Sequence, residues 1–257
     1  MKRQTLSSLV ASAVLLASPV AMAGVSVSVP AFEAQVATAR TAASPGGTSI
    51  TRAEMTAALS AFQSDDHVVD AAEHTYLGTK LADSVWKTGI NGPAIKYLGD
   101  FYELYDAGPV APQGVTLVTT STATLYGSSG PLAGASRIAE GYIPNGQGVA
   151  NNETLKDAYF AVAYPRAHEQ SDDFYPITLA DLVTTLRGQV LFQQMPTADD
   201  VDGAVAYITQ ISRNSNRLYI SSFVSELDGG WAAGYVIAAV STDRRYIRFV
   251  RVTTASD

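Results

Sequence analysis

The chain ends in three strand-like runs, Leu218-Tyr-Ile-Ser-Ser-Phe-Val224, Gly234-Tyr-Val-Ile-Ala-Ala-Val240 and Tyr246-Ile-Arg-Phe-Val-Arg-Val252. Each run is rich in β-branched or aromatic residues, which are favoured in strands. Turn-forming residues fill both gaps, with Asp228-Gly-Gly230 in the first and Ser241-Thr-Asp243 in the second. Because gaps this short join antiparallel neighbours, the sequence predicts a C-terminal three-stranded meander.

A meander of this size needs other elements to cover its apolar face, and the segments before it can supply them. Thr178 caps a predicted helix over residues 179–187, and Gly188 follows the end of that helix. Thr197 caps a second predicted helix over residues 198–212. We expect both helices to lie on one face of the sheet.

Further strands are predicted upstream of the meander. Residues 189–195 suit a fourth strand, and the Thr-rich residues 115–126 suit one long strand or two short ones. A long loop with one short strand is predicted over residues 127–152, whereas residues 158–164 fit a helix and a strand equally well. Together these patterns predict an α+β domain over residues 113–257, with an antiparallel sheet covered by helices.

Residues 50–108 are predicted to form an N-terminal unit of three helices. Two of these helices begin with paired N-cap and N3 residues, Thr51 with Glu54 and Asp70 with Glu73, which is the pattern of a capping box. The third helix follows a turn, and aromatic residues recur along it at helical spacing: Tyr97, Phe101, Tyr102 and Tyr105. We interpret these rings as core residues whose hydroxyls reach its edge, rather than as a ligand site.

Part of this helical unit, residues 43–81, resembles a degenerate pair of EF-hands. Ile50 and Val69 each stand four places before a glutamate, as the aliphatic residue of an EF-hand calcium loop does. The resemblance implies a calcium site whose ligands lie in the second loop: Asp66, Asp70 and Glu73. The first loop departs from the family pattern, because its first, third and fifth positions carry no carboxylate. Two capped helices that form a hairpin are the alternative interpretation of the same residues.

The first residues carry the three parts of a secretory signal peptide. Lys2 and Arg3 form a basic region, residues 9–16 a short apolar region, and Ala21-Met-Ala23 a cleavage site. We therefore expect residues 1–23 to be removed and the protein to be exported, to a periplasm or to the outside of the cell.

The segment after the signal peptide, residues 24–49, is predicted to be a flexible leader. Val25-Ser-Val-Ser-Val29 alternates as a short edge strand does. The Ala-rich residues 30–43 fit a helix that begins at its proline, and Ser44-Pro-Gly-Gly47 breaks that helix.

The composition of the chain excludes several classes of protein. Of the 257 residues, 47% are hydrophobic and 16% are charged, which suits a folded chain rather than a disordered one. Without residues 1–23, which hold two cations and no acid, the formal charge falls from −7 to −9. This balance argues against a nucleic acid or an anionic membrane as partner, and no later run is apolar for long enough to span a membrane. The lack of cysteine excludes disulfides, thiol catalysis and cysteine-ligated zinc.

Catalytic motifs are incomplete in this chain. Two Gly-Ser runs approach the nucleophile motif G-x-S-x-G without matching it. There are three histidines, His67, His74 and His168, and the H-E-x-x-D run at the last of them lacks the second histidine of zinc peptidases. A hydrolase would have to assemble its site from the loops 127–150 and 166–176.

Arginine gathers at the last predicted strand, where Arg244, Arg245, Arg248 and Arg251 lie within eight residues. On a strand, Arg248 and Arg251 point to opposite faces. We predict a partner-binding patch at Arg245, Arg248 and Arg251. The alternatives are an ion pair with a covering helix and the protection of an edge strand against aggregation.

These observations favour an exported protein that binds an unknown protein or small molecule, or associates with the cell envelope, without catalysis. An unrecognised secreted hydrolase that uses the two loops is one alternative. A calcium-stabilised envelope protein is the other.

Overall fold

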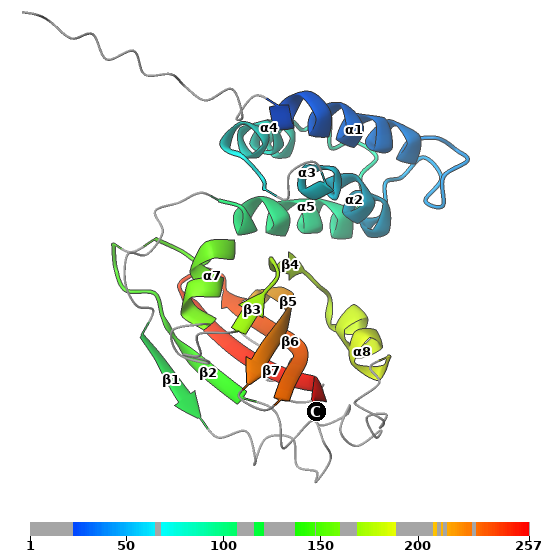
Figure 1. The fold of residues 1–257 in the computed structure, drawn as a ribbon. Helices are drawn as coiled ribbons and strands as arrows, with labels where there is room; N and C mark the ends of the chain where they lie inside the picture. The colour runs from blue at the N-terminus through cyan, green and yellow to red at the C-terminus, as the bar shows by residue number, and fades with distance from the viewer. Residues whose placement is uncertain are drawn as a thin grey trace, which may run out of the picture.

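A computed structural model describes residues 23–64, 68–106, 116–120, 137–146, 148–159, 169–188, 208–209, 212, 215–227 and 230–256. The helices of the first hundred residues form one layer, which lies against an antiparallel sheet built from the rest of the chain (Figure 1). The predicted α+β class is confirmed. No helix among the described residues is both long and apolar enough to cross a lipid bilayer.

Among the described residues, the helical unit has five helices around one core: α1 Ala23–Ala39, α2 Arg52–Leu59, α3 Ala61–Ser64, α4 Ala71–Ala82 and α5 Gly92–Leu104. Four of them, α2 to α5, lie within residues 50–108, where three were predicted. The core side chains of this unit are fully buried and come from all five helices: Phe32, Met55, Phe62, Leu77, Leu98 and Phe101. The aromatic residues Tyr97 and Phe101 of α5 are core residues, as predicted.

In the segment predicted as a leader, the strand at Val25–Val29 is wrong, whereas the helix predicted over residues 30–43 is present as part of α1. These valines belong to α1, and Phe32, Val36 and Ala39 of the same helix are buried in the core. Their spacing of four and three residues is helical, so packing against α2, α3 and α4 overrides the local alternation. The helix breaks before Gly47, whose φ of +64° favours glycine.

Both predicted capping boxes are present. The Thr51 hydroxyl accepts from the Glu54 backbone N–H while the Glu54 carboxylate accepts from the Thr51 N–H, and Asp70 and Glu73 do the same for α4. Ile50, which precedes the first cap, bridges in parallel to Ile90. This bridge places the starts of α2 and α5 side by side.

The sheet has seven strands: β1 Thr116–Thr120, β2 Arg137–Tyr142, β3 Glu169–Ser171, β4 Tyr175–Pro176, β5 Ser215–Leu227, β6 Gly230–Ser241 and β7 Tyr246–Ser256. Their order is β1-β2-β7-β6-β5-β3, with β4 also on β5, and every pairing is antiparallel. The C-terminal meander is therefore confirmed, with strands longer than predicted.

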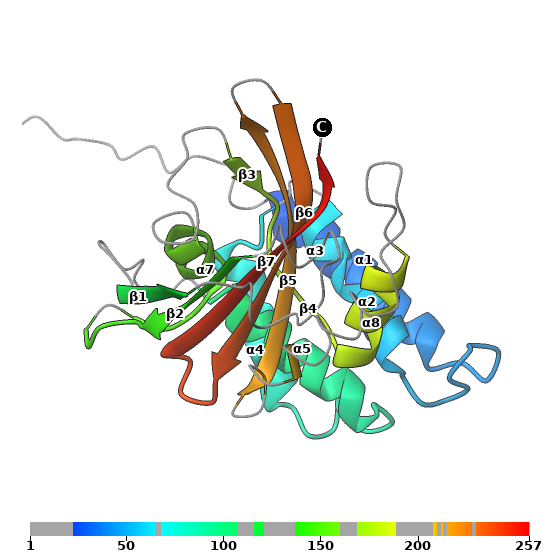
Figure 2. The same cartoon turned by 90° about the horizontal axis from the view of Figure 1, so that it is seen from below.

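Helices cover both faces of this sheet, whereas the sequence analysis expected them on one. Helix α8 (Leu179–Arg187) packs Leu182 and Leu186 on one face, and helix α7 (Asn152–Ala158) packs on the other (Figures 1 and 2). The reason lies in β6, where residues 236–240 are all buried. A continuous apolar run of this kind is typical of a strand covered on both sides.

Several predicted elements lie outside the described residues. These are the strand at 189–195, most of the helix at 198–212 and the ambiguous residues 160–164. Of the helix at 198–212, Ile208 is described and lies in the core under α8. The short strand expected within 127–152 is β2.

Candidate functional site

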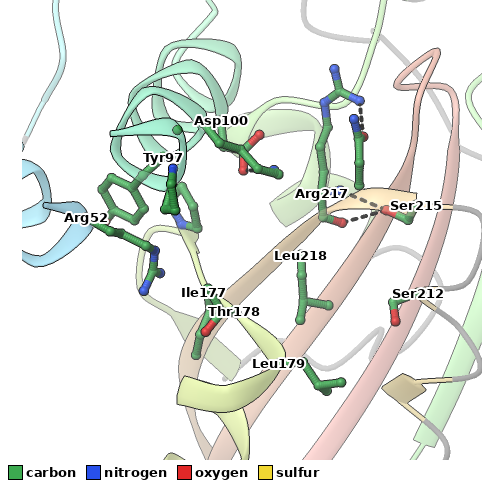
Figure 3. A pocket seen from close by; sticks show the side chains of 15 residues that line it. Arg52, Tyr97, Asp100, Ile177, Thr178, Leu179, Ser212, Ser215, Arg217 and Leu218 are labelled. Carbon is green, nitrogen blue, oxygen red and sulfur yellow. Dashed lines mark hydrogen bonds and ion pairs between the residues drawn. The ribbon is translucent and has the colours of Figure 1, made fainter. Parts of the chain in front are cut away.

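A cleft of about 430 Å³ lies where the helical unit meets the sheet. Its walls come from α5, from the segment that leads from β4 into α8, and from the start of β5 (Figure 3). Tyr97 and Asp100 extend into the view from α5, and Leu218 and Arg217 extend from β5. The cleft therefore combines side chains from parts of the chain more than a hundred residues apart.

Local structure explains why these side chains converge. Asn91 caps α5 by accepting from the Ala94 N–H at 2.9 Å, and the residues that α5 gives to the cleft follow at helical spacing. Thr178 caps α8 in the same way, which places Ile177 and Leu179 on either side of the cap. The Ile177 N–H donates to the Leu218 carbonyl at 2.9 Å and so fixes this segment to β5.

Much of the cleft wall is apolar. It is formed by one aromatic ring, two prolines and three aliphatic side chains: Tyr97, Pro93, Pro176, Ile177, Leu179 and Leu218. Three of the aliphatic residues, Ile177, Leu179 and Leu218, also pack against the core under α8. Packing from behind holds this wall in one shape.

Lys96 and Asp100 form an ion pair on the α5 side of the cleft. The Lys96 side chain is 51% exposed, whereas that of Asp100 is only 16% exposed. Burial raises the pKa of Asp100 above its ordinary value, and Lys96 only partly opposes this. The Lys96 ammonium has three N–H donors and is half exposed, so it can contact a second anion while it stays paired with the largely buried Asp100 carboxylate.

Arg52 and Tyr97 lie side by side at another edge of the cleft (Figure 3). The Arg52 guanidinium lies 5.0 Å from the centre of the Tyr97 ring and forms an ion pair with Asp181 of α8. Burial raises the pKa of Tyr97, so its hydroxyl stays protonated. The Arg52–Asp181 pair links the helical unit to α8 across the cleft.

Arg217 links β5 to α5. It makes two hydrogen bonds to the Glu103 carboxylate, one of them between Nη2 and Oε1 at 2.7 Å. Burial raises the pKa of Glu103, but the hydrogen bonds and charge of Arg217 outweigh this effect, and the net pKa lies below the ordinary value. This pair fixes one end of the cleft.

The serine hydroxyls at the cleft are used as structural donors. Ser212 donates to the Thr209 carbonyl at 3.1 Å, and Ser215 donates to the Arg217 carbonyl at 2.7 Å. Among the described residues that line the cleft there is no histidine. His74, which the sequence analysis considered, instead stacks on Tyr102 at 4.0 Å in the helical unit.

The structure gives a partner inside the protein to each of the three arginines at which a partner-binding patch was predicted, Arg245, Arg248 and Arg251. Arg251 is 3% exposed, donates to the Tyr159 hydroxyl at 3.1 Å and lies 3.8 Å from the centre of the Phe223 ring. Arg248 forms an ion pair with Glu140. An ion pair was one of the predicted alternatives, but Glu140 lies on the neighbouring strand β2 and not on a covering helix. Arg245 donates to the carbonyl of residue 143 at 2.7 Å.

Arg244, the fourth member of the run, joins the sheet to the helical unit. It donates to the Glu103 carbonyl at 2.6 Å and to the Ala150 carbonyl at 2.7 Å. Its φ of +59° is rare for a residue with a side chain. The arginine cluster is thus part of the internal framework.

The predicted calcium ligands are only partly described. Asp70 accepts from the N–H groups of Ala72 and Glu73 at 2.8 Å, and Glu73 accepts from the Asp70 N–H at 2.9 Å and from the buried Ser28 hydroxyl. Both carboxylates therefore satisfy the start of α4, as the alternative interpretation holds. Asp66 lies outside the described residues, and within the described part of the chain no three acidic or histidine side chains group as metal ligands.

The two loops of the hydrolase alternative are partly described. Residues 137–142 form β2 and residues 169–171 form β3, and the strands β7, β6 and β5 lie between them. The strands β2 and β3 are therefore four strand spacings of about 4.8 Å apart. His168 and the Gly-Ser runs lie outside the described residues.

The sequence analysis did not identify the cleft. Lys96 and Asp100 form an i, i+4 pair directly after a capped helix start, and this spacing is the only sequence signal for them. No protein-family model matches the sequence, and neither a curated protein nor a solved structure matches the chain.

Proposed function

We propose that this chain is an exported, non-catalytic binding protein that takes a small amphipathic anion into the cleft between α5, α8 and β5. The observation that carries the proposal is the pairing of a supported apolar wall with a half-exposed cationic side chain, Lys96. Pockets of this composition are the usual sites of small ligands.

The apolar wall suits an aromatic or aliphatic group. Pro93, Ile177, Leu179 and Leu218 offer hydrocarbon surface, and the Tyr97 ring adds a flat face. Each Å² of apolar ligand surface that leaves water contributes about 25 cal/mol, so a ring that fills the cleft supplies most of the affinity.

The charged residues suit an anion. The cleft is lined by three cations, Arg52, Lys96 and Arg217, and by one acid, Asp100, in a chain whose formal charge is −7. Asp181, Asp100 and Glu103 pair with these three cations, so an anion is oriented by the exposed Lys96 ammonium rather than by a net positive charge. Lys96 makes the first contact, since Arg52 and Arg217 are bound to acids that join the two units.

Binding without chemistry is the preferred interpretation because of what the polar groups of the cleft already do. Ser212 and Ser215 donate to backbone carbonyls. The Thr178 hydroxyl donates to Asp181, but this carboxylate is a weak base: burial raises its pKa, and the hydrogen bonds of Thr178 and Arg52 lower the pKa below its ordinary value on balance. A nucleophilic hydroxyl would instead donate to a base that takes its proton.

A pair of fluorescent probes tests the proposal. The anionic probe is 8-anilinonaphthalene-1-sulfonate, and the neutral probe is N-phenyl-1-naphthylamine, which has the same aromatic body without the charge. We expect the folded protein to bind both, and Lys96→Gln to weaken only the anionic probe, by about fivefold. Leu218→Ser should weaken both.

Lys87→Gln is the matched control, because Lys87 lies on the helical unit away from the cleft and should change neither probe. Equal affinity of Lys96→Gln and the unmodified protein for the anionic probe would contradict the proposed anion site. A loss of both probes in Lys87→Gln would show that the probes report unfolding rather than the cleft.

Acidity provides a second test of the same pair. Since the pKa of Asp100 is raised, this group loses its charge at a less acidic pH than an ordinary aspartate and then releases Lys96. The sulfonate probe stays anionic, so we expect its affinity to increase as the pH falls through the pKa of Asp100. Asp100→Asn should bind the probe tightly at neutral pH and remove this dependence.

Export is supported by the basic, apolar and cleavage regions within residues 1–23. Mass spectrometry of the protein recovered from the envelope or the medium of its own cells should find Gly24 as the first residue. A chain recovered from the cytosol that still carries Lys2 and Arg3 would contradict export and leave the cleft proposal untouched.

A further inference from the structure

We infer a second binding site, for an uncharged sugar ring, at the open end of the sheet face that carries α8. This inference does not depend on the cleft. The site consists of two cross-strand pairs on β2 and β7, Tyr142 with Tyr246 and Glu140 with Arg248, and of the hollow beside them.

This end of the face differs from the part that α8 covers. Val250 and Val252 of β7 are buried under Leu182 and Leu186, whereas Tyr142 is 63% exposed. Because side chains on one face of a strand recur every second residue, Tyr246 and Arg248 share the face of the two valines. The sheet therefore continues as a platform where its helical cover ends.

The platform presents an aromatic surface held in place. The rings of Tyr142 and Tyr246 lie 4.5 Å apart, and the Arg248 guanidinium lies 5.1 Å from the centre of the Tyr246 ring. Tyr246 is thus packed between two neighbours and supports Tyr142 from one side. A flat, exposed ring of this kind packs well against the C–H face of a pyranose, which is apolar and flat too.

A hollow of about 310 Å³ adjoins these rings. The buried Ala239 contributes a small side chain to the hollow. The polar residues that line it are Ser215, Ser241, Asp243 and Arg248. The hollow offers both kinds of polar group that sugar hydroxyls need, since the arginine donates hydrogen bonds and the carboxylate accepts them.

The charges of the site argue for an uncharged ligand. Arg248 is neutralised by Glu140 at 3.1 Å, and the Asp243 carboxylate accepts from the Ser241 hydroxyl and from the Arg245 N–H at 3.1 Å. An ionic ligand would have to replace one of these partners. A sugar can hydrogen-bond to the outer lone pairs and N–H groups while each pair stays intact.

The site is built on paired strands, so it needs little ordering when a ligand binds. Glu140 lies opposite Arg248 and Tyr142 opposite Tyr246 in the register of β2 and β7. Side chains on a sheet keep these positions without a ligand, and this lowers the entropic cost of binding.

Neutral hexaoses test the inference on the full chain. Titration calorimetry with cellohexaose, chitohexaose, laminarihexaose and maltohexaose should give a dissociation constant at or below about 1 mM for at least one of them. Tyr142→Ala should weaken that hexaose about tenfold, and Tyr142→Phe should restore the binding because the ring remains. Tyr175→Ala, at another exposed tyrosine, should bind normally.

Three results would overturn the inference. One is that no hexaose binds at about 1 mM to protein whose circular dichroism shows it folded. Another is that Tyr142→Ala, equally folded, binds as the unmodified protein does. The third is concentration-dependent self-association that Tyr142→Ala abolishes without any sugar binding, since the platform would then contact a second copy of the chain. The probes of the cleft should bind Tyr142→Ala normally in every case.

Discussion

The capping boxes of the helical unit and the arginines of the sheet find their partners at different distances along the chain. In the helical unit the capping boxes of α2 and α4 join residues only three positions apart. In the sheet the buried Arg251 meets Tyr159, 92 residues earlier, and Arg217 meets Glu103, 114 residues earlier. Local bonds form as soon as a helix forms, whereas distant bonds require the completed fold. The two regions should therefore respond differently to the loss of one polar group.

The largest effect is expected at Arg251. Arg251→Ala removes the hydrogen bond to the buried Tyr159 hydroxyl and the contact with Phe223, and we expect a loss of about 3 kcal/mol in the free energy of unfolding. Urea unfolding followed by circular dichroism measures it. Arg248→Ala, on the same strand but half-buried, is the control and should cost about 1 kcal/mol or less. Equal losses would mean that burial of the distant bond is not what matters.

The bond between the two regions should have an intermediate effect. A double-mutant cycle of Arg217→Ala and Glu103→Gln should give a coupling energy of about 1.5 kcal/mol, since the pair is charged, doubly hydrogen-bonded and partly buried. The more exposed Arg52–Asp181 pair also crosses between the regions, and its coupling should be about 0.5 kcal/mol or less. Similar couplings for both pairs would contradict the role assigned to burial.

A local cap should have a smaller effect. Asp70→Ala removes the acceptor for two N–H groups at the start of α4, and the expected cost is about 1 kcal/mol in a thermal or urea unfolding experiment. Thr75→Ala in the same helix is the control, because Thr75 is exposed and caps nothing. A larger loss for Asp70→Ala than for Arg251→Ala would reverse the comparison of the two regions.

The smallest effect is expected in the pH dependence of stability, at Glu54 in the cap of α2. Hydrogen bonds from the backbone and hydroxyl of Thr51 lower the pKa of Glu54 from 4.5 to about 2. The contribution of Glu54 is therefore fully present above about pH 4.5 and is lost as the pH falls through about 2. Glu54→Gln should have a flatter dependence of the urea midpoint on pH over this range. An unchanged slope would mean that other carboxylates dominate acid unfolding.

The distance along the chain between two bonded groups also decides whether their contact could be predicted from the sequence. The caps at Thr51, Asp70 and Thr178 lie within three residues of the groups that they satisfy, and all three were predicted. The meander strands were predicted too, because their turns are short. Nothing in the sequence near Arg251 points to Tyr159, so the burial of this arginine could not be predicted.

The cleft could not be predicted either, because it is formed by residues that are distant in the sequence. Its walls come from α5, from the segment before α8 and from β5, and only the finished packing brings Tyr97 close to Leu218. The strand pattern of Val25–Val29 failed for a related reason. The partners that make this segment a helix lie in α2, α3 and α4, beyond the reach of a local pattern.

Helix α5 serves both regions with different sides of its surface. Ala94, Leu98 and Phe101 pack into the helical core, whereas Pro93, Lys96 and Asp100 line the cleft. Under the proposed function, substitutions in the second group would alter ligand preference without removing the helix from its core. Related chains with other ligands should diverge at positions 93, 96 and 100 while positions 94, 98 and 101 stay small or apolar. Tyr97 belongs to both sets, so substitutions at this position should affect both the helical core and the cleft.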